Sequence, residues 1–345
     1  MDSLTQFVLG AAVAAAVVPA AQRRRALVYG AALGTLPDLD VLISYGDPVA
    51  DFTLHRSFSH SLLVLALLAP LLYAIAARFD HALREAPRAW PAAFAAALLT
   101  HPLLDAMTIY GTQLLWPLDR TPYGVGSVFI IYPLYTLPLL LAAGIACWRP
   151  LARFSQLWLR GALLVSSAYL GWSVLAQQWV LQQARSELAR QGSAPAQILA
   201  LPGPFNTLLW RVLVREPGGY REAYFSLLAD DVPGPWRQFR SLDELQPVLA
   251  EHPAFVRLQH FTHGYYSLRV QGESLVVSDL RMGSEPAYVF AFALARQQAA
   301  DWQPHPAVQL PTQRPVGAAL VWLRMRLTTP GAQLPPPDLV LAQER

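Results

Sequence analysis

The chain has 345 residues, of which 54% are hydrophobic and 14% charged, and its formal net charge is +3. The charged share is well below the roughly one quarter that is usual in soluble domains, so the composition indicates a membrane protein. The arginines stand in short clusters between apolar runs, a pattern that excludes a nucleic-acid-binding face. The one cysteine, Cys147, excludes a disulfide framework, so a metal site here must use oxygen and nitrogen ligands.

Six apolar segments fill the first half of the chain and predict about six membrane-spanning helices. They cover residues 4–18, 26–43, 61–77, 90–110, 128–148 and 157–180. An arginine triplet at 23–25 follows the first segment, which is the wrong order for a cleaved signal peptide, so we expect that segment to be retained.

The second half predicts a small, mainly antiparallel β domain. We expect strands at residues 207–215, 220–228, 255–261, 265–270, 274–280 and 288–295, separated by Gly, Pro or Asp turns. The predicted fold class is therefore a multi-pass α-helical membrane domain at 1–180 followed by this β domain at 205–329. A helical and turn-rich connector at 181–204 joins them, and a Pro-rich tail occupies 330–345.

The distribution of arginine predicts the orientation in the membrane. One set of connections holds nine arginines and is expected to be cytoplasmic, whereas the opposite set up to residue 180 holds only Arg56 and Arg120. Six crossings then place the N-terminus and the β domain on the extracytoplasmic side.

Three clusters of aspartate and histidine fall on that same outer side, at the ends of apolar segments where polar groups are costly. The last pair, His101 and Asp105, has the i, i+4 spacing that puts both side chains on one helix face. We interpret all six residues as metal ligands: Asp38, Asp40, His55, His60, His101 and Asp105. They suit one or two divalent ions, most readily Zn²⁺ and otherwise Mn²⁺ or Fe²⁺, and the expected chemistry is hydrolysis by a metal-activated water.

Three residues are predicted to act in catalysis: Asp40, Arg56 and His60. The Arg56 guanidinium matches the geometry of an anionic group such as a phosphate; the alternative is an ion pair with Asp47 or Asp51. For Asp40 the alternative is a helix cap.

Other polar residues near the clusters receive supporting roles. Gln6 and Asp2 lie at the outer end of the first helix and either reach the site or, for Asp2, cap that helix. The nearby hydroxyl residues are interpreted as supporting or packing groups: Ser57, Ser59, Thr100 and Thr108. Three histidines of the β domain are interpreted as surface or turn residues: His252, His260 and His263.

Four stretches together resemble the bacterial membrane-bound metal-dependent hydrolase family of YdjM type. They are Met1-Asp2-Ser3-Leu4-Thr5-Gln6, Gly34-Thr35-Leu36-Pro37-Asp38-Leu39-Asp40, His55-Arg56-Ser57-Phe58-Ser59-His60-Ser61 and His101-Pro102-Leu103-Leu104-Asp105. The resemblance covers residues 1 to about 180, and two later stretches are similar to the extra domain of longer members: Phe205-Asn206-Thr207-Leu208-Leu209-Trp210-Arg211 and Asp279-Leu280-Arg281-Met282-Gly283.

This resemblance implies a bacterial inner-membrane location and, through a distant similarity to zinc-dependent phospholipase C proteins, phosphoester hydrolysis. Two departures bear on a second metal ion. Gln6 stands where many relatives have His, and Tyr132 stands where Asp is common.

The predicted function is a membrane-embedded metal-dependent hydrolase that cleaves a phosphoester or other ester of a lipid or cell-envelope substrate at the outer face. Its expected partners are membrane lipids and no nucleic acid, and the sequence carries no signal for an oligomeric state. One alternative is a metal-binding transporter or sensor, which predicts further acidic or histidine residues across the last two segments, where we find none. The other is a non-catalytic envelope scaffold with a structural polar cluster.

Overall fold

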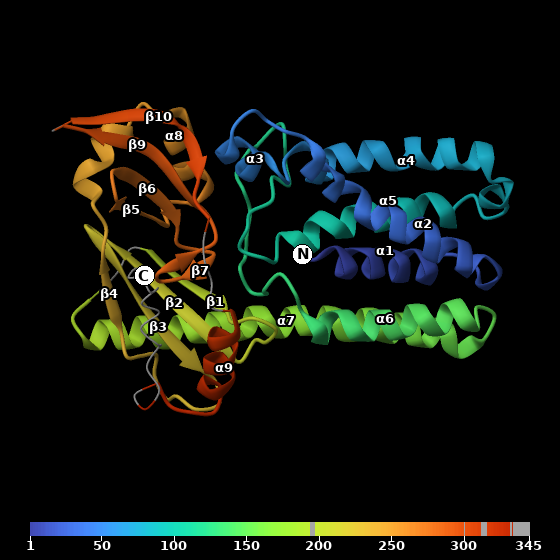
Figure 1. Cartoon of the computed structure of the whole chain (residues 1–345). Helices are drawn as coiled ribbons and strands as arrows, with labels where there is room; N and C mark the ends of the chain where they lie inside the picture. The colour runs from blue at the N-terminus through green and yellow to red at the C-terminus, as the bar shows by residue number, and fades with distance from the viewer. Residues whose placement is uncertain (194–196, 300, 312–315, 332, 334–345) are drawn as a thin grey trace. The chain divides into compact units, whose positions relative to one another are not determined.

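The computed structural model describes residues 1–193, 197–299, 301–311, 316–331 and 333. The chain forms two compact units, a helical one of Met1–Ile43 and His55–Val174 and a mixed one of Ser44–Leu54 and Leu175–Arg345. Helices dominate the first unit and antiparallel sheets the second (Figure 1). This order confirms the predicted sequence of a helical region followed by a β-rich region.

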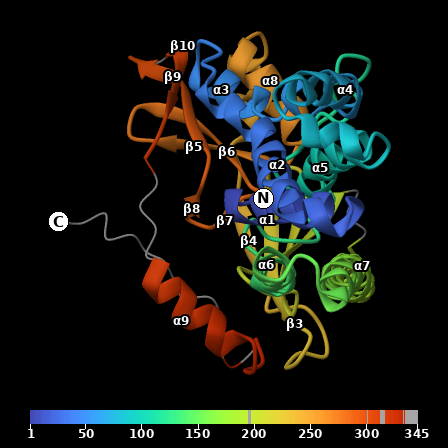
Figure 2. The same ribbon diagram turned by 90° about the vertical axis from the view of Figure 1, so that its right-hand side faces the viewer.

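Each of the six apolar segments forms a helix of the first unit. Their bounds are α1 Ser3–Val17, α2 Arg23–Thr35, α4 Leu62–Phe79, α5 Ala89–Asp105, α6 Pro133–Trp148 and α7 Arg153–Arg190, which belongs to the second unit from Leu175 onward. Short 3₁₀ helices link them: η1 Ala20–Gln22, η2 Leu36–Leu42, η3 Phe58–His60 and η4 His81–Glu85. Figure 2 views the bundle nearly end-on, with α1 beside α2 and α5.

Three glycines allow α1 and α2 to pack with their backbones in contact. A Cβ added at Gly30 would lie 2.3 Å from the carbonyl oxygen of Gly10, and one added at Gly10 would lie 2.9 Å from the Cα of Gly34. Small residues at such a crossing are typical of helix pairs in membranes. The crossing brings the C-terminal end of α2, and with it η2, close to the start of α1.

Two described helices, α4 and α7, are long and apolar enough to cross a membrane. About six spans were predicted, and the number is lower because α1, α2, α5 and α6 have only 15, 13, 17 and 16 residues. The exposed face of α4 carries an apolar side chain at every fourth position: Leu63, Leu67, Leu71, Ile75 and Phe79. Such a stripe is unfavourable in water and suits a hydrocarbon environment.

The second unit contains two four-stranded antiparallel sheets. The first has the order β1-β2-β3-β4, with bounds Gln197–Pro202, Leu209–Glu216, Gly219–Ser226 and Arg237–Arg240. The second has the order β10-β9-β6-β5, with bounds Asp301–Gln309, Ala291–Gln298, Ser274–Asp279 and Tyr266–Gln271. A two-stranded ribbon, β7 Gly283–Ser284 and β8 Ala287–Tyr288, and the helices α3 Pro48–Leu54, η5 Asp243–Leu249, α8 Pro253–Phe261 and α9 Val316–Arg326 complete the unit. Its core includes Val180 and Ala184 of α7 packed with Trp210 and Phe225 of the first sheet.

One predicted strand is wrong, because residues 255–261 form helix α8. The side chain of His252 accepts a hydrogen bond from the Ala254 N–H and Pro253 occupies the first turn, so this sequence starts a helix. The buried residues Phe255, Leu258 and Phe261 then recur at helical spacing.

Several further elements were not predicted, among them the short elements α3, β4, η5 and β7. β1 lies in the stretch expected to form turns, and β10 and α9 lie beyond the last predicted strand. The Pro-rich tail predicted from residue 330 lies, from 334 onward, outside the described residues.

Candidate metal centre

Four of the six predicted ligands converge on one point of the helical unit. They are Asp38 of η2, His60 of η3, and His101 and Asp105 of α5, and their ligand atoms all lie within 4.8 Å of one another. The i, i+4 spacing on α5 brings His101 and Asp105 together. The other two residues lie on short 3₁₀ helices, η2 directly after α2 and η3 directly before α4. His60, His101 and Asp105 are buried, and the Asp38 side chain is 19% exposed.

The five distances that involve an imidazole Nε2 match the edges of a coordination tetrahedron, and the two carboxylate oxygens lie within 4.8 Å of each other. Nε2 of His60 lies 3.1 Å from Nε2 of His101 and 3.2 Å from Oδ2 of Asp105, which is 3.4 Å from Nε2 of His101. Oδ1 of Asp38 lies 3.4 Å from both imidazole Nε2 atoms. Ligands bound to zinc at about 2.0–2.1 Å are separated by about 3.3 Å, so the four groups fit one such ion.

Hydrogen bonds on the far side of each imidazole turn a lone pair toward this point. Nδ1–H of His101 donates to the carbonyl oxygen of Gly34 at 2.6 Å, because a carbonyl can only accept. The Ser59 hydroxyl donates to Oδ2 of Asp40 at 2.5 Å and therefore accepts from Nδ1–H of His60 at 2.9 Å. Partners of this kind orient metal-binding histidines and fix their tautomer.

This arrangement is electrostatically unfavourable without a cation. Two imidazole lone pairs face each other at 3.1 Å beside two carboxylates. Among the described residues, Oδ2 of Asp105 accepts no hydrogen bond although it is buried. Buried polar atoms are normally satisfied, so the cluster has the donor set of a metal site and one buried carboxylate oxygen that is free to bind an ion.

Asp40 and His55 lie beside the cluster and form a pair of their own. Oδ1 of Asp40 lies 2.8 Å from Nδ1 of His55, and Oδ2 accepts from the backbone N–H of Arg56 at 2.9 Å as well as from Ser59. Asp40 thus supports His60 through Ser59. The His55 side chain is 21% exposed.

Arg56 lies beside the cluster, next to the carboxylate of Asp105. Its Nε lies 3.4 Å from Oδ2 of Asp105, and its guanidinium stacks over the Tyr110 ring at 4.9 Å. The expected alternative partners are engaged elsewhere: Asp47 accepts from the N–H groups of Val49 and Ala50, and Asp51 from that of Tyr45.

The residues near the start of α1 divide between capping and support. Asp2 caps the helix by accepting from the Thr5 N–H. The Gln6 amide donates to the carbonyl oxygen of His101 at 3.2 Å and to Oδ1 of Asp105 at 3.1 Å, and the Met1 amino group contacts the same Oδ1. Tyr132 is buried with its ring against Tyr169.

Sequence reasoning grouped Ser59 with Ser57 and the two threonines, and did not distinguish it as the link between Asp40 and His60. Its position directly before a ligand histidine was the available signal. The role of the Gly34 carbonyl had no such signal, because it depends on how α2 crosses α5.

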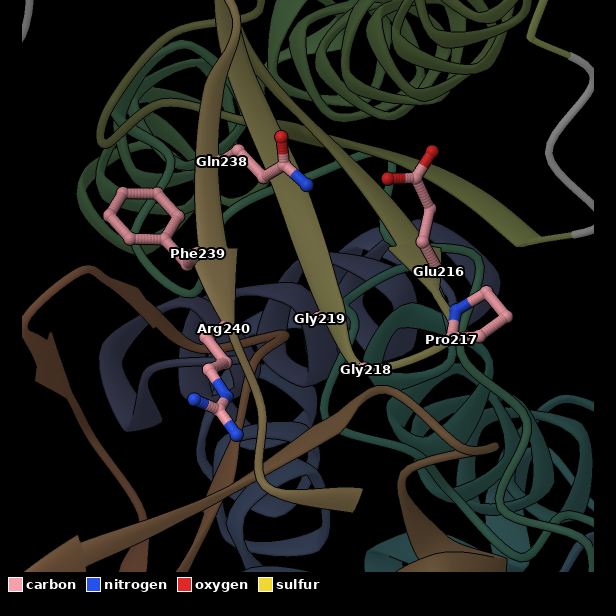
Figure 3. Close-up of a pocket in the computed structure, with 7 residues that line it drawn as sticks. All are labelled: Glu216, Pro217, Gly218, Gly219, Gln238, Phe239 and Arg240. Carbon is pink, nitrogen blue, oxygen red and sulfur yellow. The ribbon is translucent and has the colours of Figure 1, made fainter. Parts of the chain in front are cut away.

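The second unit holds no comparable cluster among its described residues. His260 and His263 are exposed at the end of α8, and His252 caps that helix. A pocket of about 410 Å³ lies between the β2–β3 turn and β4, lined by Glu216, Pro217, Gly218, Gly219, Gln238, Phe239 and Arg240. Figure 3 shows the Glu216 and Arg240 side chains pointing away from each other, so the pocket gathers no converging charges.

Comparison with known proteins gives one match. The model of a family described as YdjM inner membrane protein matches residues 1–180, the part of the chain that contains all four clustered residues. No curated protein and no solved structure matches the chain.

Proposed function

The chain belongs to the YdjM inner membrane protein family, and from that premise we propose that it is a membrane-embedded, metal-dependent hydrolase. The proposal rests chiefly on one observation, the convergence of Asp38, His60, His101 and Asp105, whose ligand atoms all lie within 4.8 Å of one another. Zinc is the ion whose bond lengths this set fits most directly, and the mixed nitrogen and oxygen donors also accept Mn²⁺ or Fe²⁺.

A divalent ion held there would lower the pKa of a coordinated water to about 7 and polarise an ester bond. Four protein ligands complete a tetrahedron, so a reacting group needs one of them to move or the coordination to expand. Asp38 is the one ligand whose side chain reaches solvent, and it lies on a short 3₁₀ helix. We therefore propose that the substrate reaches the metal from the side on which Asp38 lies.

The neighbouring residues supply a proton acceptor and a positive charge. Asp40 holds Nδ1 of His55, so Nε2 of His55 is the atom that exchanges a proton during hydrolysis. The Arg56 guanidinium, buried next to Asp105, offsets negative charge on a phosphoester. The substrate class that follows is a phosphoester, or another ester, of a lipid or envelope compound.

The membrane arrangement in this proposal follows the arginine distribution. All six apolar helices cross or enter the bilayer, and the cluster lies at the extracytoplasmic face together with the β-rich domain. An amphiphilic substrate then reaches the cluster from the outer leaflet. The exposed apolar side chains Leu39, Val41 and Leu42 on η2, around the buried Asp40, support this route.

The metal content of the purified protein tests the proposal. We expect about one Zn²⁺ or Mn²⁺ per chain in the wild type and loss of that ion in His60→Ala and in His101→Ala, each of which removes one of four ligands. The exposed His81 of η4 supplies the matched control, and His81→Ala should keep the ion. Equal metal content in all four proteins would refute the metal site.

A second candidate function is a purely structural cation that ties η2, η3 and α5 together, and the complete set of four ligands favours it. Asp38→Ala separates the two. A hydrolase should lose or change turnover of bis(p-nitrophenyl) phosphate in this variant, whereas for a structural site the variant should lower only thermal stability, with no turnover in any protein.

A further inference from the structure

The residues that separate Asp40 from His55 belong largely to the other compact unit. Residues Ser44–Leu54, here called the joining segment, group with the β-rich part of the chain, although both flanking stretches group with the helical unit. The joining segment begins four residues after Asp40 and ends directly before His55. The two members of this pair are therefore connected through a piece of chain that the β-rich domain holds.

The joining segment is anchored by packing of its short helix, α3. Asp47 starts α3 by accepting hydrogen bonds from the N–H groups of Val49 and Ala50, both at 2.9 Å. Val49, Ala50, Phe52 and Thr53 are buried. A helix of seven residues is not stable alone, so its conformation depends on the surface against which it packs.

Phe52 packs among aromatic side chains of the β-rich domain. Its ring stacks on Phe290 with a centroid distance of 3.9 Å and meets the edge of Phe261 at 4.8 Å, with Phe292 at 5.8 Å. These three partners come from α8, from the residue before β9 and from β9 itself. One side chain of the joining segment thus inserts among three aromatic rings of the β-rich domain.

A buried ion pair between Arg281 and Asp279 packs against the Phe261 ring of this aromatic cluster. The Arg281 guanidinium lies 4.9 Å over the Phe261 ring and pairs with Oδ2 of Asp279 at 2.8 Å, and both residues are buried. Leu280, between them, accepts a hydrogen bond from Nη1 of Arg211 at 2.8 Å. Arg211 is itself paired with Glu222 inside the first sheet. Both sheets therefore fix the residues on which Phe52 rests.

We propose that Phe52 is a positioning residue, and that a task of the β-rich domain is to hold Asp40 and His55 in place beside the metal cluster through the joining segment. This inference rests on the proposed function, because it assigns a role to the pair that exchanges the proton. The connection also extends to a ligand, since Asp40 orients His60 through Ser59. Release of Phe52 loosens residues on both sides of the segment at once.

Amide hydrogen exchange of the full-length protein in detergent or nanodiscs tests this coupling. In Phe52→Ala we expect exchange at residues 36–43 and 55–60 to rise by about tenfold or more, since local opening of the anchored segment becomes easier. Phe52→Leu keeps most of the apolar volume and should give an intermediate increase, which keeps the test usable if the alanine variant unfolds. Val256→Ala, on the exposed side of α8, is the matched control and should exchange like the wild type.

Turnover of bis(p-nitrophenyl) phosphate provides the functional readout. We expect kcat to fall in Phe52→Ala with KM unchanged when zinc is supplied in excess, because the Asp40–His55 pair moves while the excess zinc keeps the site filled, and to recover in part in Phe52→Leu. Unchanged exchange at 36–43 and 55–60 in both Phe52 variants would overturn the inference. A wild-type protein that holds no metal and cleaves no probe would refute the proposed function instead, and the exchange data would still decide the coupling.

Discussion

At the scale of single residues, the site depends as much on the partners of the two histidines as on the ligands themselves. Ser59 and the Gly34 carbonyl each take an Nδ1–H, and both Nε2 atoms are left facing the other ligand groups. A histidine without such a partner can rotate or change tautomer, and both weaken metal binding.

Ser59→Ala should therefore weaken zinc binding about 10- to 100-fold, although Ser59 is not a ligand. The loss arises because His60 no longer has a fixed tautomer and Asp40 no longer reaches it. Competition with a chromogenic chelator measures the change. Ser3→Ala, at the exposed start of α1, is the control, and an affinity like that of the wild type in Ser59→Ala would contradict the proposed orientation of His60.

The sequence indicated which residues gather in this region, but not which of them enter the cluster and which lie beside it. The i, i+4 spacing of His101 and Asp105 indicates a shared face on any α-helix, and the structure places both in the cluster. Asp38 and Asp40 are two apart on a 3₁₀ helix, where they point in different directions, so only Asp38 enters the cluster. Spacing alone also did not reveal whether His55 or His60 would join Asp38 in the cluster.

At the scale of elements, the crossing of α1 and α2 controls the site from a distance. Gly10 and Gly30 bring the two backbones together, and Gly34, one turn after Gly30, supplies the carbonyl that orients His101. The position of a ligand is thus fixed by a contact between helices that carries no polar side chain.

Gly30→Ala should lower metal occupancy without altering any ligand. The new Cβ would lie 2.3 Å from the backbone oxygen of Gly10, so α2 must shift, at a cost of about 1–3 kcal/mol in stability. Gly144→Ala in α6 is the control, since a Cβ there has no neighbour within 4 Å. Metal analysis and thermal unfolding measure the two effects, and identical occupancy in both variants would show that the crossing does not govern His101.

Hydropathy located all six helices of the first unit because long apolar runs leave few other structures available. The second unit was harder. Residues 255–261 have aromatic and β-branched residues typical of a strand, but the cap at His252 and the proline after it favour a helix. β10 contains Pro304 and Pro306, which weaken a strand pattern, and it pairs with β9 through an irregular register at the sheet edge.

At the scale of the whole molecule, the distribution of arginine predicts an orientation in the membrane. The only cysteine, Cys147, is exposed near the end of α6 and is expected on the cytoplasmic side, whereas Ser44 in the joining segment is expected outside.

Labelling of intact cells with a membrane-impermeant maleimide checks this orientation. The wild type should remain unlabelled, and Ser44→Cys in a Cys147→Ser background should react. Permeabilised cells give the reference for full labelling of both proteins. Labelling of Cys147 from outside, with protection of the new cysteine, would reverse the proposed topology.

The arrangement of the joining segment also constrains how the protein is made. Phe52 leaves the ribosome more than 200 residues before the rings that receive it, Phe261, Phe290 and Phe292. Until then α3 has no surface on which to fold, while the helices on either side are already being inserted. If the β-rich domain positions the Asp40–His55 pair as proposed, this pair assembles only after residues 261–292 have been translated and folded.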